Sequence, residues 1–238
     1  MGRLYIIATP IGNLEDITLR AIRVLGSVDA LACEDTRRTR ILFERHGIPS
    51  PRTIFSYREA NEDSAGPRIL ELLSEGRSVG ICSDAGYPGI SDAGYRAVVS
   101  AVRAGFAVEV VPGASAVEPA LLSSGLPTSS FTFKGFAPRK KGARRRFLAT
   151  DAALPHTLIL YESPNRIVAL LSDALLVLGD RLAAVCTEMT KQFERVRRGR
   201  LSELLAQLEG ESVRGELTVV IAGNNPKLSG NAPPNDPH

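Results

Sequence analysis

The residues with the clearest chemical meaning lie in a loop rich in glycine and aspartate. Residues 79–94 read VGICSDAGYPGISDAG, an apolar run that ends in three glycines, one proline and two aspartates. Glycine lets backbone approach a ligand closely, because it lacks a Cβ and adopts positive φ. Two more apolar runs end in small residues, LYIIATPIGN at 4–13 and VEVVPGASA at 108–116. Open α/β sheets bind ligands at the carboxyl ends of their strands, so we expect one shared pocket; three ordinary turns are the alternative.

The sequence argues against several common kinds of active site. The chain has no GxxxxGK[ST] phosphate loop, and the glycines of 86–94 do not fit GxGxxG. GISDA at 89–93 approaches a G-x-S-x-G nucleophile turn, but His156 is poorly placed as its base, and we interpret Ser91 as a helix cap. No two histidines have metalloprotease spacing. A cofactor held mainly by backbone groups fits better, and S-adenosylmethionine is such a cofactor.

Basic residues gather in two stretches of the second half. The net charge of +3 says little, but residues 132–150 hold seven cations and no acid, with Phe133, Phe136 and Phe147 among them. Residues 191–200 add five cations against one acid. The cations are Lys134, Arg139, Lys140, Lys141, Arg144, Arg145, Arg146, Lys191, Arg195, Arg197, Arg198 and Arg200. Such clusters can neutralise several phosphates, which favours a nucleic acid over the alternative of a solvated charged face.

Composition is that of a globular protein, with 44% hydrophobic and 23% charged residues in a chain of 238. No apolar stretch approaches the ~20 residues of a membrane span, and the N-terminal residues lack a signal-type pattern. We expect a cytoplasmic protein that does not engage a membrane. Cys33, Cys82 and Cys186 share no metal-ligand spacing, so we expect reduced cysteines and no metal.

Strand and helix patterns alternate along the chain, which predicts an α/β protein with largely parallel sheet. We expect strands at 4–9, 28–33, 52–56, 79–83, 107–111, 130–133, 157–161, 182–187 and 216–222, and a charged edge strand at 193–198. We expect helices at 18–26, 36–46, 66–75, 91–104, 115–123, 164–177 and 201–209. The basic stretch at 139–146 is expected to be an extended loop. Two domains, 1–114 and 115–223, are followed by a tail at 224–238 that we expect to be disordered.

These motifs resemble the tetrapyrrole-methylase-like (class III) S-adenosylmethionine methyltransferases. The resemblance runs in order along nearly the whole chain, and it departs at Ala93, where the related loop usually carries proline. Its carriers are ATPIGNLEDITLRA (8–21), CEDTRRTRILFERHGI (33–48), SDAGYPGISDAG (83–94), VPGASA (111–116), KGFAPRKKGARR (134–145), YESPNR (161–166) and RGELTVVIAG (214–223). Within this family, the sequence closely resembles members that 2′-O-methylate a cytidine in the decoding region of bacterial 16S rRNA.

The resemblance implies two α/β domains of the tetrapyrrole methylase type with the cofactor cleft between them, and a homodimer. It implies a substrate within the small ribosomal subunit. The implied cofactor residues are Pro10, Gly12, Asp84, Ala85, Gly86, Ser115, Ala116, Tyr161, Met189, Gly215, Glu216 and Thr218. The basic residues expected to bind RNA are Arg37, Arg38, Lys134, Arg139, Lys140, Lys141, Arg144, Arg145, Arg146, Arg197 and Arg198.

A ribose 2′-hydroxyl is a poor nucleophile while protonated, so a nearby base should help the reaction. The dense polar sets in CEDTRR and YESPNR follow strands, where catalytic residues of such sheets lie. The candidates are Glu34, Asp35, Glu162 and Arg166. Helix capping by Asp35 and an internal Glu-to-Arg pair are the alternative interpretation. A tetrapyrrole methyltransferase on the same fold is the alternative function, because its substrate is also polyanionic.

Overall fold

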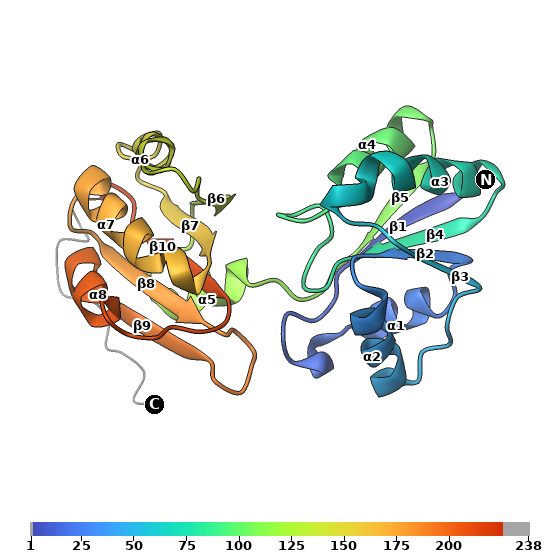
Figure 1. Cartoon of the computed structure of the whole chain (residues 1–238), viewed down its shortest axis with the longest axis horizontal. Coiled ribbons are helices and arrows are strands. Elements are labelled where there is room, and N and C mark those ends of the chain that lie inside the picture. The colour runs from blue at the N-terminus through green and yellow to red at the C-terminus, as the bar shows by residue number, and fades with distance from the viewer. Residues whose placement is uncertain (1, 226–238) are drawn as a thin grey trace. The chain divides into compact units, whose positions relative to one another are not determined.

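The computed structural model describes residues 2–225. The chain forms two compact units that divide between Ser115 and Ala116, drawn in blue to green and in green to red (Figure 1). The tail that we expect to be disordered lies outside the described residues from residue 226 onward. Among the described residues, no helix is long and apolar enough to cross a membrane.

The first unit contains a fully parallel five-stranded sheet in the order β3-β2-β4-β1-β5. Its strands are β1 (Arg3–Ile7), β2 (Ala30–Cys33), β3 (Thr53–Ser56), β4 (Ser78–Cys82) and β5 (Ala107–Val111). Its helices are η1 (Leu14–Asp16), α1 (Leu19–Leu25), α2 (Thr36–His46), η2 (Glu59–Asn61), α3 (Glu62–Ser74) and α4 (Tyr95–Arg103). The parallel sheet and each expected strand of this unit are confirmed, with ends that differ by up to two residues.

Both faces of this sheet are covered, as a parallel sheet requires. Alternate strand residues such as Leu4 and Ile6 pack with α3 and α4, whereas Ile7 and Leu31 pack on the other face with α1 and α2 (Figure 1). The helices begin and end at residues typical of caps. The Thr18 side chain accepts from the Ala21 N–H at the start of α1, and Gly47 ends α2 in the left-handed conformation.

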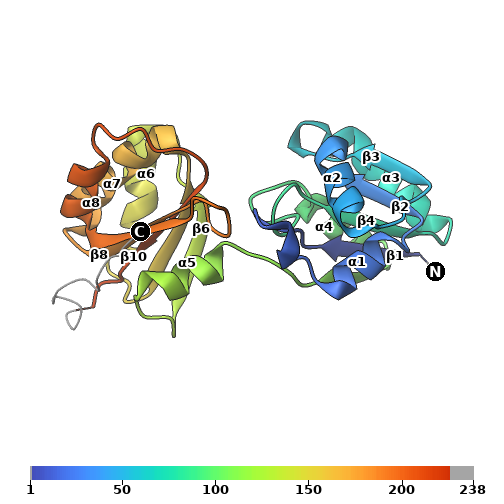
Figure 2. The same ribbon diagram turned by 90° about the horizontal axis from the view of Figure 1, so that it is seen from below.

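The second unit contains a five-stranded mixed sheet in the order β6-β7-β10-β8-β9. Its strands are β6 (Phe131–Phe136), β7 (Thr157–Glu162), β8 (Leu182–Thr187), β9 (Arg195–Arg200) and β10 (Leu217–Ile221). Its helices are α5 (Val117–Ser124), α6 (Lys141–Ala149), η3 (Pro164–Arg166), α7 (Ile167–Leu178) and α8 (Leu201–Leu208). Helices α6, α7 and α8 cover one face and α5 the other (Figure 2).

Three expectations are corrected in detail. Only β6 and β7 pair in parallel in the second sheet; β10 runs antiparallel to β7 and β8, and β9 antiparallel to β8. The basic stretch is a helix, α6, rather than an extended loop. Helix α4 begins at Tyr95 with Gly94 as its N-cap, and Ser91 is an exposed loop residue with φ +63° rather than a cap. A tight turn, in which the Gly89 N–H donates to the Ala93 oxygen, delays the start of this helix.

Candidate functional site

The three loops singled out in the sequence meet at one edge of the first sheet. Strand β1 lies between β4 and β5, so their carboxyl ends are neighbours. Thr9 and Gly86 exchange backbone hydrogen bonds of 2.9 and 3.0 Å, which join the loops after β1 and β4. The Gly113 N–H donates to the Tyr87 hydroxyl at 3.1 Å, which joins the loop after β5. The expected convergence of the loops is confirmed.

Side-chain hydroxyls reinforce this convergence. The Thr9 hydroxyl donates to the Ser83 oxygen at 3.0 Å, and the Ser83 hydroxyl lies 3.3 Å from the Gly86 oxygen. Gly86 has φ +73°, a conformation that favours glycine. A Cβ on Gly113 would lie 3.0 Å from the Ala8 Cβ, so the β1 and β5 loops are packed closely. The three loops are therefore joined mainly by backbone groups and by small side chains.

The implied cofactor residues of the first unit fall in these loops. Pro10 and Gly12 follow β1, and Asp84, Ala85 and Gly86 follow β4. Ser115 lies in the loop after β5 and ends the first unit; Ala116 begins the second and is the N-cap of α5.

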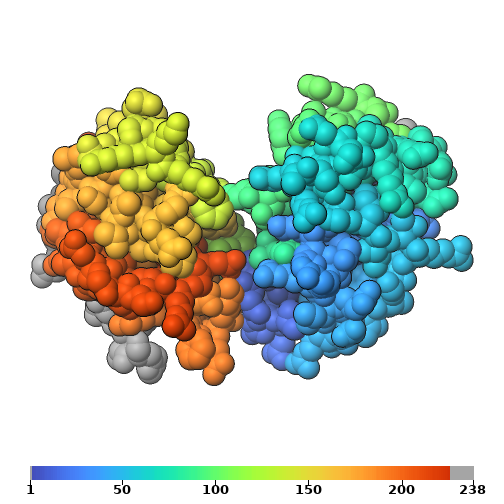
Figure 3. All heavy atoms as spheres, in the orientation of Figure 1, coloured from blue at the N-terminus to red at the C-terminus, as the bar shows by residue number. Residues whose placement is uncertain are grey.

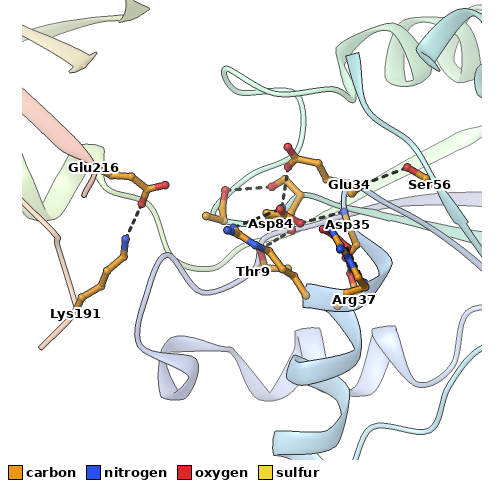
Figure 4. A network of polar contacts seen from close by, with 12 residues as sticks. Thr9, Glu34, Asp35, Arg37, Ser56, Asp84, Lys191 and Glu216 are labelled. Carbon is orange, nitrogen blue, oxygen red and sulfur yellow. Dashed lines mark hydrogen bonds and ion pairs between the residues drawn. The ribbon is translucent and has the colours of Figure 1, made fainter. Parts of the chain in front are cut away.

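Glu34 and Asp84 bind the ends of β2 and β4 to each other (Figure 4). The Glu34 carboxylate accepts from the Asp84 N–H at 3.0 Å, and the Asp84 carboxylate accepts from the Asp35 N–H at 3.1 Å. Arg38 lies 3.4 Å from the other Asp84 oxygen. Burial, followed by the charge of Glu34, raises the pKa of Asp84 above its usual range. An acidic group with a raised pKa beside a cluster of loops is typical of a functional site.

Asp35 has the structural role that the alternative interpretation gave it. Its side chain caps α2 by accepting from the Arg37 N–H at 2.8 Å, and it pairs with the Arg37 guanidinium at 2.7 Å (Figure 4). The hydrogen bonds from the Arg37 side chain and backbone lower the pKa of Asp35. Helix capping by Asp35 is therefore confirmed, and a carboxylate held this firmly in its ionised form is a weak base.

Glu162 and Arg166 form an internal pair in the second unit. Arg166 Nε lies 3.1 Å from Glu162 Oε1, and the Ser163 N–H donates to the same oxygen at 2.8 Å. Arg166 also donates to the Ala137 oxygen. The side chain of Glu162 is 0% exposed, and its Oε2 has no hydrogen-bond partner among residues 2–225. Burial raises the pKa of this carboxyl despite Ser163 and Arg166. The expected Glu-to-Arg pair is confirmed.

The implied cofactor residues of the second unit lie in two groups. Tyr161 and Thr218 are directly paired between β7 and β10, on the face covered by α5. Met189, Gly215 and Glu216 lie in loops that Glu188 and Lys191 hold together. Glu188 accepts from the Glu216 N–H at 3.0 Å, and Lys191 lies 2.8 Å from Glu188 and 2.9 Å from Glu216 (Figure 4 shows the Lys191–Glu216 pair).

Sequence reasoning missed the part that Glu188 plays in these loops. Glu188 and Thr190 have positive φ, at 53° and 65°, and strained residues of this kind concentrate at functional sites. A Cβ on Gly215, which has φ +81°, would lie 2.0 Å from Glu188 Oε1. The glycine in RGEL was the one visible signal that another group approaches the backbone here.

The predicted RNA-binding cations divide into buried and exposed groups. Lys134 pairs with Asp151, Arg144 with buried Asp173, and Arg197 with Glu211. The expectation that these three cations face RNA is corrected, because their side chains are 16, 7 and 7% exposed. Exposed cations remain on the segment around α6, drawn yellow-green at the surface of its unit (Figure 3), and on α2. They are Arg37, Arg38, Arg139, Lys140, Lys141 and Arg146.

The two remaining basic residues are partly buried. Arg145 Nε donates to Asp173 at 2.6 Å, so one buried carboxylate holds two arginines of α6. Arg198 Nε donates to the Ser123 oxygen at 2.8 Å, which joins β9 to α5. Part of the basic signal in the sequence therefore serves the internal structure of the second unit.

Comparison with known proteins identifies the family of this chain. The family model described as Tetrapyrrole (Corrin/Porphyrin) Methylases matches residues 3–205. The chain belongs to this family. The tetrapyrrole methylase resemblance seen in the motifs is thus confirmed, and so is the α/β fold class with two units of that type.

Relatives within the tetrapyrrole methylases cover nearly all of the chain. "Ribosomal RNA small subunit methyltransferase I" of Micromonospora olivasterospora is 49% identical over 94% of this chain and 71% of its own length. The protein of the same name from Halalkalibacterium halodurans is 46% identical over 95% of this chain and 78% of its own length. The crystal structure of uroporphyrin-III-C-methyltransferase from Thermus thermophilus has a TM-score of 0.65 at 22% identity, covering 93% of this chain and 94% of that one, a likeness of fold.

Proposed function

We propose that this chain is an S-adenosylmethionine-dependent methyltransferase that 2′-O-methylates a cytidine in the decoding region of 16S rRNA. The observation that carries the proposal is the similarity, at 46 and 49% identity over nearly the whole chain, to proteins named as small-subunit rRNA methyltransferases. The cytidine, its 2′-hydroxyl and the decoding region rest on the sequence resemblance. The same resemblance supports a homodimer in the cytoplasm that acts on the small ribosomal subunit.

The cofactor proposal is supported by the loops of the first unit. Gly86 and Gly113 bring backbone groups close together without side-chain bulk, which suits a ligand bound by main-chain N–H and C=O groups. The residues proposed to hold it there are those implied by the resemblance: Pro10, Gly12, Asp84, Ala85, Gly86 and Ser115. Ala116, Tyr161, Met189, Gly215, Glu216 and Thr218 are proposed from the second unit. When bound, S-adenosylmethionine supplies an electrophilic methyl group.

The residues of the chain have to orient the hydroxyl and receive its proton. Of the four proposed catalytic residues, Asp35 is held as an anion by Arg37, and Glu162 is buried in its pair with Arg166. Glu34 is partly exposed and lies beside the converging loops, bound to Asp84. We therefore assign the role of base to Glu34. Glu162 and Arg166 are assigned a structural role within the second unit.

Single-turnover methylation tests this assignment. We expect Glu34→Gln to slow the methyl-transfer step by about 10²-fold or more, the usual contribution of a general base. Glu162→Gln should leave the step within a few-fold of the wild-type rate. Full activity in Glu34→Gln would remove it as the base, and a large loss confined to Glu162→Gln would reverse the assignment.

The whole function is tested by mapping the modification. Small ribosomal subunits from cells that lack this protein are incubated with the purified chain and isotopically labelled S-adenosylmethionine, and the 16S rRNA is then mapped by mass spectrometry. The expected result is one additional ribose methyl on a cytidine. Absence of any methyl group on the rRNA would overturn the proposal.

A tetrapyrrole methyltransferase is the second candidate, favoured by the family description and by the fold of uroporphyrin-III-C-methyltransferase. Exposed Arg139, Lys140 and Lys141 lie one after another at the start of α6, an arrangement better suited to a chain of phosphates than to a compact macrocycle. Methyl transfer to uroporphyrinogen III, with none to rRNA, would favour this candidate instead.

A further inference from the structure

Strand β6 contains a bulge at Gly135. Phe133 pairs with Ile159 and Phe136 pairs with Tyr161, so three residue steps on β6 match two on β7. The extra residue is accommodated where Gly135 adopts φ +61°, the arrangement of a glycine bulge. In a regular strand, residues three apart point to opposite faces. Because of the bulge, Phe133 and Phe136 lie on the same face as Tyr161.

The three rings form an aromatic cluster at the edge of the second sheet. The Phe133 and Tyr161 ring centroids are 4.8 Å apart at an interplanar angle of 65°, and those of Phe136 and Tyr161 are 5.7 Å apart at 60°. Both geometries are favourable for aromatic pairs and hold the rings in place. β6 is an edge strand, and Phe136 is 52% exposed. The cluster thus presents one firmly positioned aromatic ring to solvent.

The residues that follow the exposed ring are cationic. Beyond Ala137 and Pro138 come Arg139, Lys140 and Lys141, each exposed. An aromatic side chain flanked by cations is the combination with which proteins bind single-stranded nucleic acid, since the ring stacks on a base while the cations meet the phosphates. A purely apolar partner would bring no countercharge for these three residues.

We propose that Phe136 is the stacking surface for one unpaired base of the RNA substrate, with Arg139, Lys140 and Lys141 contacting the adjacent phosphates. The inference rests on the proposed function and deepens it, because it names the kind of RNA that the site takes: a single-stranded nucleotide rather than a continuous duplex. Tyr161, proposed to contact the cofactor, sets the angle of the Phe136 ring. The stacked base would therefore lie next to a residue of the methyl-donor site.

Fluorescence tests stacking directly. The chain has no tryptophan, so Phe136→Trp introduces a single selective probe at the proposed surface. We expect a ten-nucleotide oligocytidylate to quench this fluorescence saturably, and to quench it less at high salt. Leu176→Trp, at a 62% exposed position on α7, is the matched control and should not be quenched. Equal quenching of both variants, quenching of neither, or quenching by uroporphyrinogen III alone would overturn the proposal.

Kinetics on small ribosomal subunits separate stacking from a structural role. Phe136→Ala should raise KM for the subunit about tenfold, within the range measured for loss of one stacked base, with kcat and the affinity for S-adenosylmethionine unchanged. Phe136→Tyr, which keeps the ring, should restore the wild-type KM. An unchanged KM in Phe136→Ala would overturn the stacking proposal. Failure of the wild-type chain to methylate rRNA would instead overturn the proposed function, and the fluorescence experiment would still decide the stacking.

Discussion

At the scale of single residues, several charged side chains that the sequence suggests are exposed form buried ion pairs instead. Asp173 on α7 accepts from Arg144 at 2.8 Å and from Arg145 at 2.6 Å, and its side chain is 3% exposed. Burial alone would raise the pKa of this carboxyl, but the hydrogen bonds and charges of the two guanidinium groups outweigh it and hold the pKa below its usual range. One buried carboxylate on α7 therefore holds two arginines of the basic helix α6.

We expect Asp173→Asn to lower the free energy of unfolding by about 3 kcal/mol at neutral pH, because it leaves two arginines without their buried countercharge. A carboxyl whose pKa is lowered in the folded state stabilises the protein at pH values above its unfolded pKa of about 3.8. This stabilisation is lost as the pH falls through the folded-state pKa. The difference between wild type and variant should therefore shrink below pH ~4. Chemical denaturation at several pH values measures it. Asp63→Asn, which breaks the exposed pair with Arg96, is the control and should change nothing measurable.

The Glu34–Asp84 contact gives a second prediction at this scale. In Glu34→Gln an amide oxygen can still accept the Asp84 N–H, but the negative charge is gone. Since that charge helps to raise the pKa of Asp84, we expect the pKa of Asp84 to fall in the variant. Carbon-detected NMR titration of the side-chain carboxyls measures it. An unchanged or higher pKa would show that the two carboxylates do not interact.

At the scale of elements, the convergence of loops follows from strand order, and glycines permit it. Gly86 and Gly47 both have positive φ, at 73° and 61°, but Gly86 joins two loops at the proposed cofactor site and Gly47 ends α2. We expect Gly86→Ala and Gly47→Ala to lower the free energy of unfolding similarly, by about 1 kcal/mol, because both positions disfavour a Cβ. Gly86→Ala alone should weaken binding of S-adenosylmethionine.

Calorimetry with S-adenosylmethionine and thermal unfolding of both variants make this comparison. Equal donor affinity in the two variants would show that the convergent loops do not contact the cofactor. Equal weakening in both would attribute the effect to lost stability.

The elements that the sequence predicted well are those with local signals. The parallel first sheet follows from apolar runs alternating with helices, and cap residues such as Thr18 and Gly47 mark the ends of those helices. Other features have no local signal. Pro67 is typical of the first turn of a helix, which predicts a helix that begins at residue 66. Helix α3 instead begins at Glu62 and contains Pro67. The antiparallel pairing of β10 depends on which strands lie beside it, which periodicity does not encode.

The candidate site, like the fold, was predictable only where it has a local signal in the sequence. The loops after β1, β4 and β5 could be found because glycine marks where backbone must approach backbone. The bulge at Gly135 could not be found, because it depends on strand register, and neither could the hydrogen bonds that join Asp84 to Glu34 and Asp35, because these residues lie far apart in sequence. The seven cations of residues 132–150 have no acid near them in the sequence, but Arg144 and Arg145 share one acidic partner, Asp173, on α7.

At the scale of the whole molecule, charge distribution matters more than total charge. The net charge is +3, so any three cations replaced by alanine bring it to zero. Arg139, Lys140 and Lys141 are exposed and follow Phe136 closely along the second unit, whereas Arg23, Arg52 and Arg103 are exposed residues of the first unit. Two triple alanine variants therefore have the same net charge but lose it on different units.

We expect the Arg139, Lys140 and Lys141 triple alanine variant to weaken RNA binding and to flatten its salt dependence. Each lost phosphate contact on a single strand reduces the slope of log K against log salt by about 0.7, so three contacts reduce it by about 2. The Arg23, Arg52 and Arg103 variant should keep the wild-type slope, because those cations meet no phosphate. Filter binding of oligocytidylate from 50 to 300 mM salt measures both. An equal reduction of the slope in both variants would mean that RNA binding depends only on the net charge. The α6 segment would then no longer be assigned as the phosphate-binding surface.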